Sequence, residues 1–185
     1  MIVILMRGAT RLDPDLVSDG FRAVAAAHPK ALFISGDCRF HEQGLRLAAD
    51  AGLETFRLTA LYDPEIIFGP CKANWLLNEH ARLNGGDSLV GTYHKFACQL
   101  QGVIEAWPGR TLVLYFDLLM LEMAMAFLAG QGLSLLRVFS LYLDEQALAI
   151  FTRASFGEGG QWALLKSNVK PVDAFFAKPP LRLVT

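Results

Sequence analysis

The sequence predicts an α/β fold, specifically a three-layer α/β/α sandwich with a mostly parallel central sheet and antiparallel β pieces near the C-terminus. Three observations support this prediction. Short apolar runs recur along the chain and are typical of strands buried on both faces of a parallel sheet. Amphipathic helical segments separate these runs, which favours a sheet covered by helices on both faces. Beyond Gly132, β-type runs follow one another with only short turns between them, which indicates antiparallel pairing.

The first half of the chain alternates between strand and helix. Residues 2–6 are an apolar run suited to a buried strand. An amphipathic helix is expected from Asp13-Pro14-Asp15 to about Ala27, since proline is tolerated in a first helical turn. The other elements expected in this half are a strand over 30–35, a helix over 38–50 ended by Gly52, a strand over 54–58, and a helix around 74–83.

The second half begins with a capped helix. Asp87-Ser88 precedes a helix that runs to Trp107, and Pro108-Gly109 ends it. A central apolar strand follows over 111–116. The next helix, over 118–129, is so apolar on every side that it is expected to be buried. Strands are expected over 136–143, 147–153 and 161–167. Residues 1–185 are expected to form a single domain.

Composition excludes several classes of protein. The chain is 53% hydrophobic and 19% charged with a net charge of −1, which indicates a packed globular protein without the basic surface that nucleic acid requires. The opening apolar run before Arg7 is too short for the apolar region of a signal peptide, and no apolar stretch is long enough to span a membrane. Cys38, Cys71 and Cys98 are odd in number and widely spaced, so we expect reduced thiols in a cytoplasmic protein, with no metal site and no cofactor.

Two strand ends locate a candidate site. The run 2–6 delivers Arg7, and the run 111–116 delivers Asp117, each at the point where an apolar strand ends. Ligands of open α/β sheets bind at the carboxyl ends of strands. We therefore expect Arg7 and Asp117 to lie at a binding site.

Six segments match a known set of motifs in order and spacing. The matches are 6–10 to Arg-His-Gly-Glu-Thr, 16–20 to Leu-Thr-x-x-Gly, 35–39 to Ser-Pro-Leu-x-Arg, 65–69 to Glu-Ile-x-Phe-Gly, 86–88 to Gly-Glu-Ser, and 108–118 to Pro-Gly-x-Thr-x-Leu-Val-Val-Ser-His-Gly. By these motifs the chain resembles the histidine phosphatase (phosphoglycerate mutase-like) superfamily, which implies a histidine phosphatase-like fold and a phosphorylated small molecule or anion as ligand.

The departures from this pattern fall on the catalytic positions. In the family, the first histidine is the nucleophile, and the second histidine and two arginines hold the phosphoryl group. A gap-free alignment puts Met6 at the arginine and Arg7 at the nucleophile, whereas a shift by one keeps Arg7 as the arginine and puts Gly8 at the nucleophile. Both registers remain open. Asp117 stands at the second histidine and Leu118 at the following glycine.

These substitutions argue against the reaction of the family. A guanidinium is permanently charged and has no lone pair with which to attack phosphorus. A carboxylate at position 117 repels a phosphate: two unit charges ~4 Å apart interact by roughly 4 kcal/mol at an effective dielectric constant of about 20. The sequence therefore predicts that the family's reaction does not run here.

Further predictions concern the ion pair of the two strand ends and two additional site residues. Arg7 and Asp117 are expected to form an ion pair that fills the phosphate cavity, the alternative being two unrelated solvated charges. Arg39 is the surviving phosphate-binding candidate, or else a surface residue of a first helical turn. Glu65 falls where the family often places its proton donor.

Three functional interpretations remain open. The favoured one is a catalytically inactive protein on a histidine phosphatase fold, with a binding, regulatory or structural role. The second is a phosphomonoesterase that uses Asp117 as base, with or without a bound cation. The third is a homo-oligomeric scaffold, whose dimer interface would involve the 118–129 helix or Phe175-Phe176, although core packing is the preferred explanation for that helix.

Overall fold

A computed structural model describes residues 1–8, 24, 29–35, 38–58, 78, 80, 82, 87–130, 132, 147–153 and 160–169 of the chain. Nine helices and strands lie within these ranges, and each falls within a few residues of its predicted bounds. They are β1 Ile2–Arg7, β2 Ala31–Ser35, α2 Cys38–Ala51, β3 Glu54–Leu58, α5 Leu89–Ala106, β4 Thr111–Phe116, α6 Leu118–Leu128, β5 Leu148–Arg153 and β6 Trp162–Val169.

The strands form one six-stranded sheet in the order β3-β2-β4-β1-β5-β6. The pairs β2–β3, β2–β4 and β4–β1 are parallel, whereas β1–β5 and β5–β6 are antiparallel. This arrangement confirms the predicted sheet, including its antiparallel C-terminal pieces. The two central strands, β4 and β1, are those that carry the candidate site residues at their carboxyl ends.

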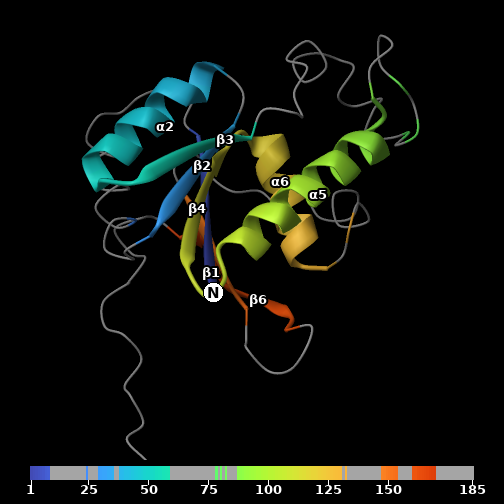
Figure 1. Cartoon of the computed structure of the whole chain (residues 1–185). Helices are drawn as coiled ribbons and strands as arrows, with labels where there is room; N and C mark the ends of the chain where they lie inside the picture. The colour runs from blue at the N-terminus through green and yellow to red at the C-terminus, as the bar shows by residue number, and fades with distance from the viewer. Residues whose placement is uncertain are drawn as a thin grey trace, which may run out of the picture.

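Helices cover both faces of the sheet, with α2 on one face and α5 and α6 on the other (Figure 1). Successive residues of β1 alternate between the two layers, as a strand requires. Val3 and Leu5 belong to the core under α5 and α6, which also holds Phe96 of α5. Ile4 and Met6 belong to the smaller core under α2. We call these the α5/α6 core and the α2 core.

Helix α6 is part of the protein's own core. Eight of its eleven residues are buried. This confirms the preferred explanation of its apolar composition, because a helix buried on most sides has little surface left to offer a partner. None of the helices in the described part of the chain is long and apolar enough to cross a membrane.

Helix α5 begins and ends at the predicted residues. The Ser88 hydroxyl accepts a hydrogen bond from the amide of Gly91 at 3.1 Å, which satisfies one of the free amides of the first turn. Trp107 is the C-cap. Gly109 has a φ of 70°, a left-handed conformation that glycine adopts without strain. The chain can thus reverse directly from α5 into β4.

One prediction is wrong, and two lie largely outside the described residues. The helix expected around 74–83 is not present at Asn78, His80 or Arg82, and Arg82 instead forms an isolated antiparallel bridge with Ser88. This bridge joins two residues of the same short stretch of chain, and a residue in such a pairing does not lie in a helix. The strand expected over 136–143 lies outside the described residues, as does the helix expected up to Ala27 except for Val24, which is helical and buried.

Candidate functional site

The candidate site lies where three parallel strands end side by side. Arg7 of β1 is in register with Phe116 of β4, and Met6 is in register with Tyr115. Tyr115 is also in register with Ile34 of β2, so the end of β2 lies level with these positions. The predicted convergence of the residue 7 and residue 117 positions is therefore observed in the backbone. This edge is the one at which open α/β sheets bind ligands.

Among the residues that the structure describes, Asp117 is the charged residue whose side chain is buried. Only 5% of its surface is exposed. It directly follows β4 and is the N-cap of α6: its Oδ1 atom accepts a hydrogen bond from the amide of Met120 at 3.1 Å. The amide and the positive end of the helix dipole both stabilise the negative charge. Asp117 therefore caps helix α6, a structural role that alignment with the family's motifs does not suggest.

Arg7 lies at the end of β1 next to this cap. Its side chain is half-buried, and the amide of the following residue, Gly8, donates to the carbonyl of Phe116 at 2.8 Å. The β1–β4 ladder therefore continues to the residue just before Asp117. This register fixes Arg7 beside the start of α6 and brings the two opposite charges to adjacent strand ends.

Met6 and Leu118 occupy the other two degenerate positions. Met6 is only 2% exposed and packs in the α2 core. Leu118 is the first residue of α6 and is partly buried. Both are apolar and lie in packed surroundings, so neither can bind an anion or transfer a proton.

Helix α2 is tied to the same strand end by a hydrogen bond that the sequence did not predict. The hydroxyl of Tyr115 donates to Oε1 of Gln43 at 2.6 Å. The helix also approaches β2 very closely, because a Cβ atom at Gly44 would lie 2.9 Å from Ile34. Arg39 lies in the first turn of α2, one turn before Gln43, and so at the edge of the sheet that carries Arg7. No local periodicity signals a contact between residues 72 positions apart.

The other predicted site residues contribute less. Glu65 lies outside the described residues. Among the residues that the structure describes, no group of three or more His, Cys, Asp or Glu side chains could hold a metal ion.

Comparisons with known proteins agree on the fold. No family model and no curated protein matches the sequence. Among solved structures, the chain is similar to a mycobacterial glucosyl-3-phosphoglycerate phosphatase, with 16% sequence identity over 91% of this chain and 99% of that one and a TM-score of 0.63. It is also similar to Bacillus stearothermophilus YhfR, with 14% identity over 91% and 96% of the two chains and a TM-score of 0.67.

A third similar structure is the phosphoserine phosphatase of Entamoeba histolytica in complex with 3-phosphoglyceric acid, with 14% identity over 92% of this chain and 98% of that one and a TM-score of 0.62. The mycobacterial phosphatase has also been solved with inorganic phosphate. The chain has the histidine phosphatase-like α/β fold. At these identities the similarity establishes the fold and leaves the activity to be argued from the site.

Proposed function

We propose that this protein is a non-catalytic member of the histidine phosphatase fold class, whose phosphate site is neutralised by Arg7 and Asp117 and which acts by binding or regulation. The observation that carries the proposal is the buried Asp117 cap at the start of α6. In the alignment with the family's motifs, position 117 corresponds to a phosphate-binding histidine. At the adjacent strand end, Arg7 aligns with the family's nucleophile or with the arginine beside it.

The charge at position 117 supports this proposal. A carboxylate buried to this degree repels an incoming phosphate by about 4 kcal/mol per unit of phosphate charge at ~4 Å and an effective dielectric constant of about 20. Its Oδ1 atom already accepts the Met120 amide, which also opposes its use as a base. Pairing with Arg7 would offset the cost of burying the charge and occupy the space that a phosphate would need.

A turnover assay tests the absence of catalysis. Purified protein is incubated with a panel of phosphomonoesters, with and without Mg²⁺ or Mn²⁺, beside the variants Arg39→Ala and Asp117→Asn. We expect no turnover above the buffer rate in any of these reactions. Turnover by the unmodified protein would overturn the proposal, and its loss in Asp117→Asn would support the phosphomonoesterase that uses Asp117 as base.

A binding experiment tests the electrostatic argument separately. Asparagine retains the oxygen that caps α6 but removes the charge, so Asp117→Asn should bind inorganic phosphate at least about 10-fold more tightly than the unmodified protein, which corresponds to ~1.4 kcal/mol. Isothermal titration calorimetry measures both affinities. Equal affinities would show that the carboxylate does not control access of anions to this site.

A third experiment rebuilds the family's site. The variant Arg7→His/Asp117→His/Leu118→Gly restores both histidines and the glycine, and it is compared with the same variant carrying Met6→Arg. We expect the Met6→Arg version to be less stable, because position 6 is 2% exposed in the α2 core. Gain of phosphatase activity in the better-folded version would show that the missing histidines account for the inactivity.

A further inference from the structure

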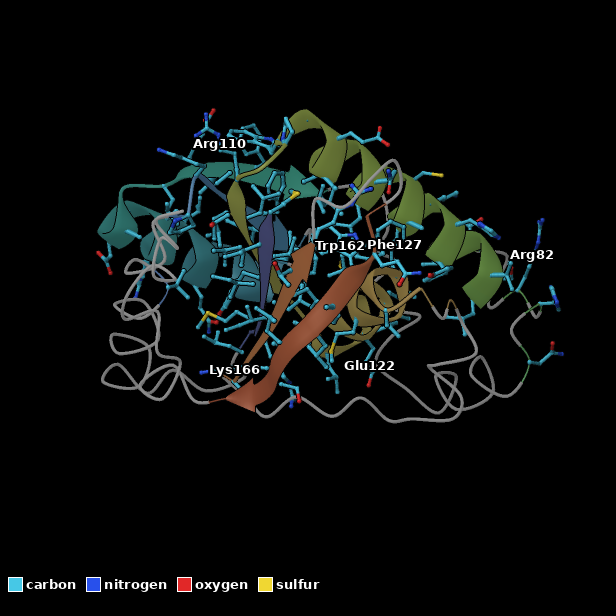
Figure 2. The ribbon with its side chains drawn as sticks, turned by 90° about the horizontal axis from the view of Figure 1, so that it is seen from below. Arg82, Arg110, Glu122, Phe127, Trp162 and Lys166 are labelled. Atoms are coloured by element: carbon cyan, nitrogen blue, oxygen red, sulfur yellow. The ribbon has the colours of Figure 1, made fainter. Side chains whose placement is uncertain are left out.

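Helix α2 is held close to the sheet at two consecutive residues. It lies on the face opposite to α5 and α6 (Figure 2). Gln43 accepts a hydrogen bond from the hydroxyl of Tyr115 at 2.6 Å. A Cβ atom at the next residue, Gly44, would lie 2.9 Å from Cδ1 of Ile34, and Ile34 is only 1% exposed, so it has no free space into which to move. The distance between α2 and β2 is therefore fixed at this point.

Tyr115 joins this contact to the strand end of the candidate site. It belongs to the α2 core, with 4% of its surface exposed. Burial of a hydroxyl is costly unless it finds a partner, and Gln43 supplies an acceptor. Tyr115 precedes Asp117 by two residues and is in register with Met6, the residue before Arg7. The residue that contacts α2 therefore belongs to the strand end that carries Asp117 and adjoins the one that carries Arg7.

The turn of α2 that comes before Gln43 carries Arg39, the phosphate-binding candidate of the proposed site. We propose that Tyr115 and Gln43 are positioning residues, which hold the first turn of α2 at the site so that Arg39 binds an anion of the phosphate type. Because a helix is rigid over one turn, fixing residues 43 and 44 also fixes the backbone of residue 39. This role rests on the proposed function, in which the Asp117 carboxylate opposes that anion.

Phosphate titrations of variants that also carry Asp117→Asn test the proposal. This substitution removes the opposing charge, and isothermal titration calorimetry measures each affinity. Arg39→Ala should weaken phosphate binding about 10-fold, because charge-assisted hydrogen bonds are lost. Tyr115→Phe removes only the hydroxyl and should weaken binding about 5-fold. The two substitutions together should cost no more than Arg39→Ala alone, because Tyr115 acts through Arg39.

Two matched controls separate positioning from a general loss of packing. Gly44→Ala forces α2 away from β2 and should weaken phosphate binding about 3-fold or more. Gly102→Ala makes the same change on α5, where the added Cβ atom meets nothing within 4 Å, and should leave the affinity unchanged. Tyr93→Phe removes a hydroxyl from α5 and should also leave it unchanged. Circular dichroism confirms that each variant is folded at the temperature of the titration.

Three outcomes would overturn the proposal. The first is a phosphate affinity that Tyr115→Phe leaves unchanged. The second is a loss in the Tyr115→Phe/Arg39→Ala variant equal to the product of the two single losses, which would show that the residues act independently. The third is no measurable phosphate binding, or binding that Arg39→Ala leaves unchanged, which would make Arg39 a surface residue of the first turn.

These outcomes are distinct from a failure of the proposed function. Each comparison of affinities keeps residue 117 the same, so it does not depend on how strongly the carboxylate repels phosphate. The proposed function fails instead through turnover by the unmodified protein, or through equal phosphate affinities of the unmodified protein and Asp117→Asn.

Discussion

The starts of α5 and α6 have the same capping geometry but different electrostatics. In each case the N-cap side chain accepts the amide of the residue three positions later, at 3.1 Å for both Ser88 and Asp117. Ser88 is neutral and half-buried, whereas Asp117 is charged and 5% exposed. Because a serine caps α5 adequately, capping alone does not require the charge at position 117. The charge needs a compensating group, and Arg7 lies at the adjacent strand end.

Charged side chains near the start of α5 are exposed, whereas Asp117 at the start of α6 is buried. Near the start of α5, Asp87 forms an ion pair with Lys95, and both side chains are about half exposed, at 47% and 56%. Exposed pairs of this kind contribute about 0 to 1 kcal/mol. A buried charge is more demanding, since removing its partner leaves it uncompensated in a poorly solvated place. Substitution of the N-cap residue or of a charged residue beside it is therefore expected to lower the free energy of unfolding much more at the start of α6 than at the start of α5.

The largest expected effect is that of Asp117→Ala. The free energy of unfolding should fall by about 3 kcal/mol, of which about 1 to 2 kcal/mol comes from the lost cap and the rest from the loss of a charge partner for Arg7. Urea denaturation at neutral pH measures the change. Asp117→Asn, which retains the cap, should recover roughly half of it; an equal loss in the two variants would leave the cap without a role.

The next largest effect is expected in a double-mutant cycle of Arg7→Met and Asp117→Asn. We expect a coupling free energy of about 2 kcal/mol between Arg7 and Asp117. The matched control is the exposed pair, with Lys95→Met and Asp87→Asn, for which about 0.5 kcal/mol or less is expected. A coupling near zero at Arg7 and Asp117 would contradict the proposed ion pair while leaving the cap unaffected.

Ser88→Ala should cost less than Asp117→Ala. Loss of the hydroxyl removes one capping hydrogen bond, and the expected destabilisation is about 1 kcal/mol, with Ser88→Asn close to neutral. The same urea denaturation measures both. A loss at Ser88 equal to that of Asp117→Ala would show that burial and charge at α6 add nothing beyond capping.

The smallest effect concerns Tyr93 of α5. Burial raises the pKa of the Tyr93 phenol, because the ionised form is poorly solvated. A group whose pKa is higher in the folded state contributes stability that is fully present below its unfolded pKa of about 10 and is lost as the pH rises through the folded value. Tyr93→Phe should therefore flatten the loss of stability above about pH 10, as measured by urea denaturation between pH 9 and 11.

Much of the fold could be predicted from local pattern. The strands 111–116 and 54–58 coincide with β4 and β3, because continuous apolar or β-branched runs bounded by breakers leave few alternatives. The caps at Ser88 and Gly109 were likewise visible in the sequence. The helix expected around 74–83 is not observed at Asn78, His80 or Arg82, and Arg82 instead makes a local backbone pairing with Ser88 that residue propensities do not predict.

The site was predicted less completely. The sequence placed Arg7 and Asp117 at strand ends, and the register of β1 with β4 confirms that these ends adjoin. The capping role of Asp117 was missed, although an aspartate directly before an apolar helix is the available signal for it. The Tyr115–Gln43 hydrogen bond carried no such signal, because its two residues belong to different elements.

By itself, the sequence determined the order of strands and helices and the absence of histidine at positions 6–8 and 117, because periodicity and residue identity are local properties. Only the tertiary structure decided that Asp117 is buried, that α2 is tied to β4 through Tyr115, and that β6 forms an end of the sheet with two exposed leucines. These features depend on which segments become neighbours after folding. Burial and hydrogen bonding between distant residues set the chemistry of the site, and no local pattern specifies them.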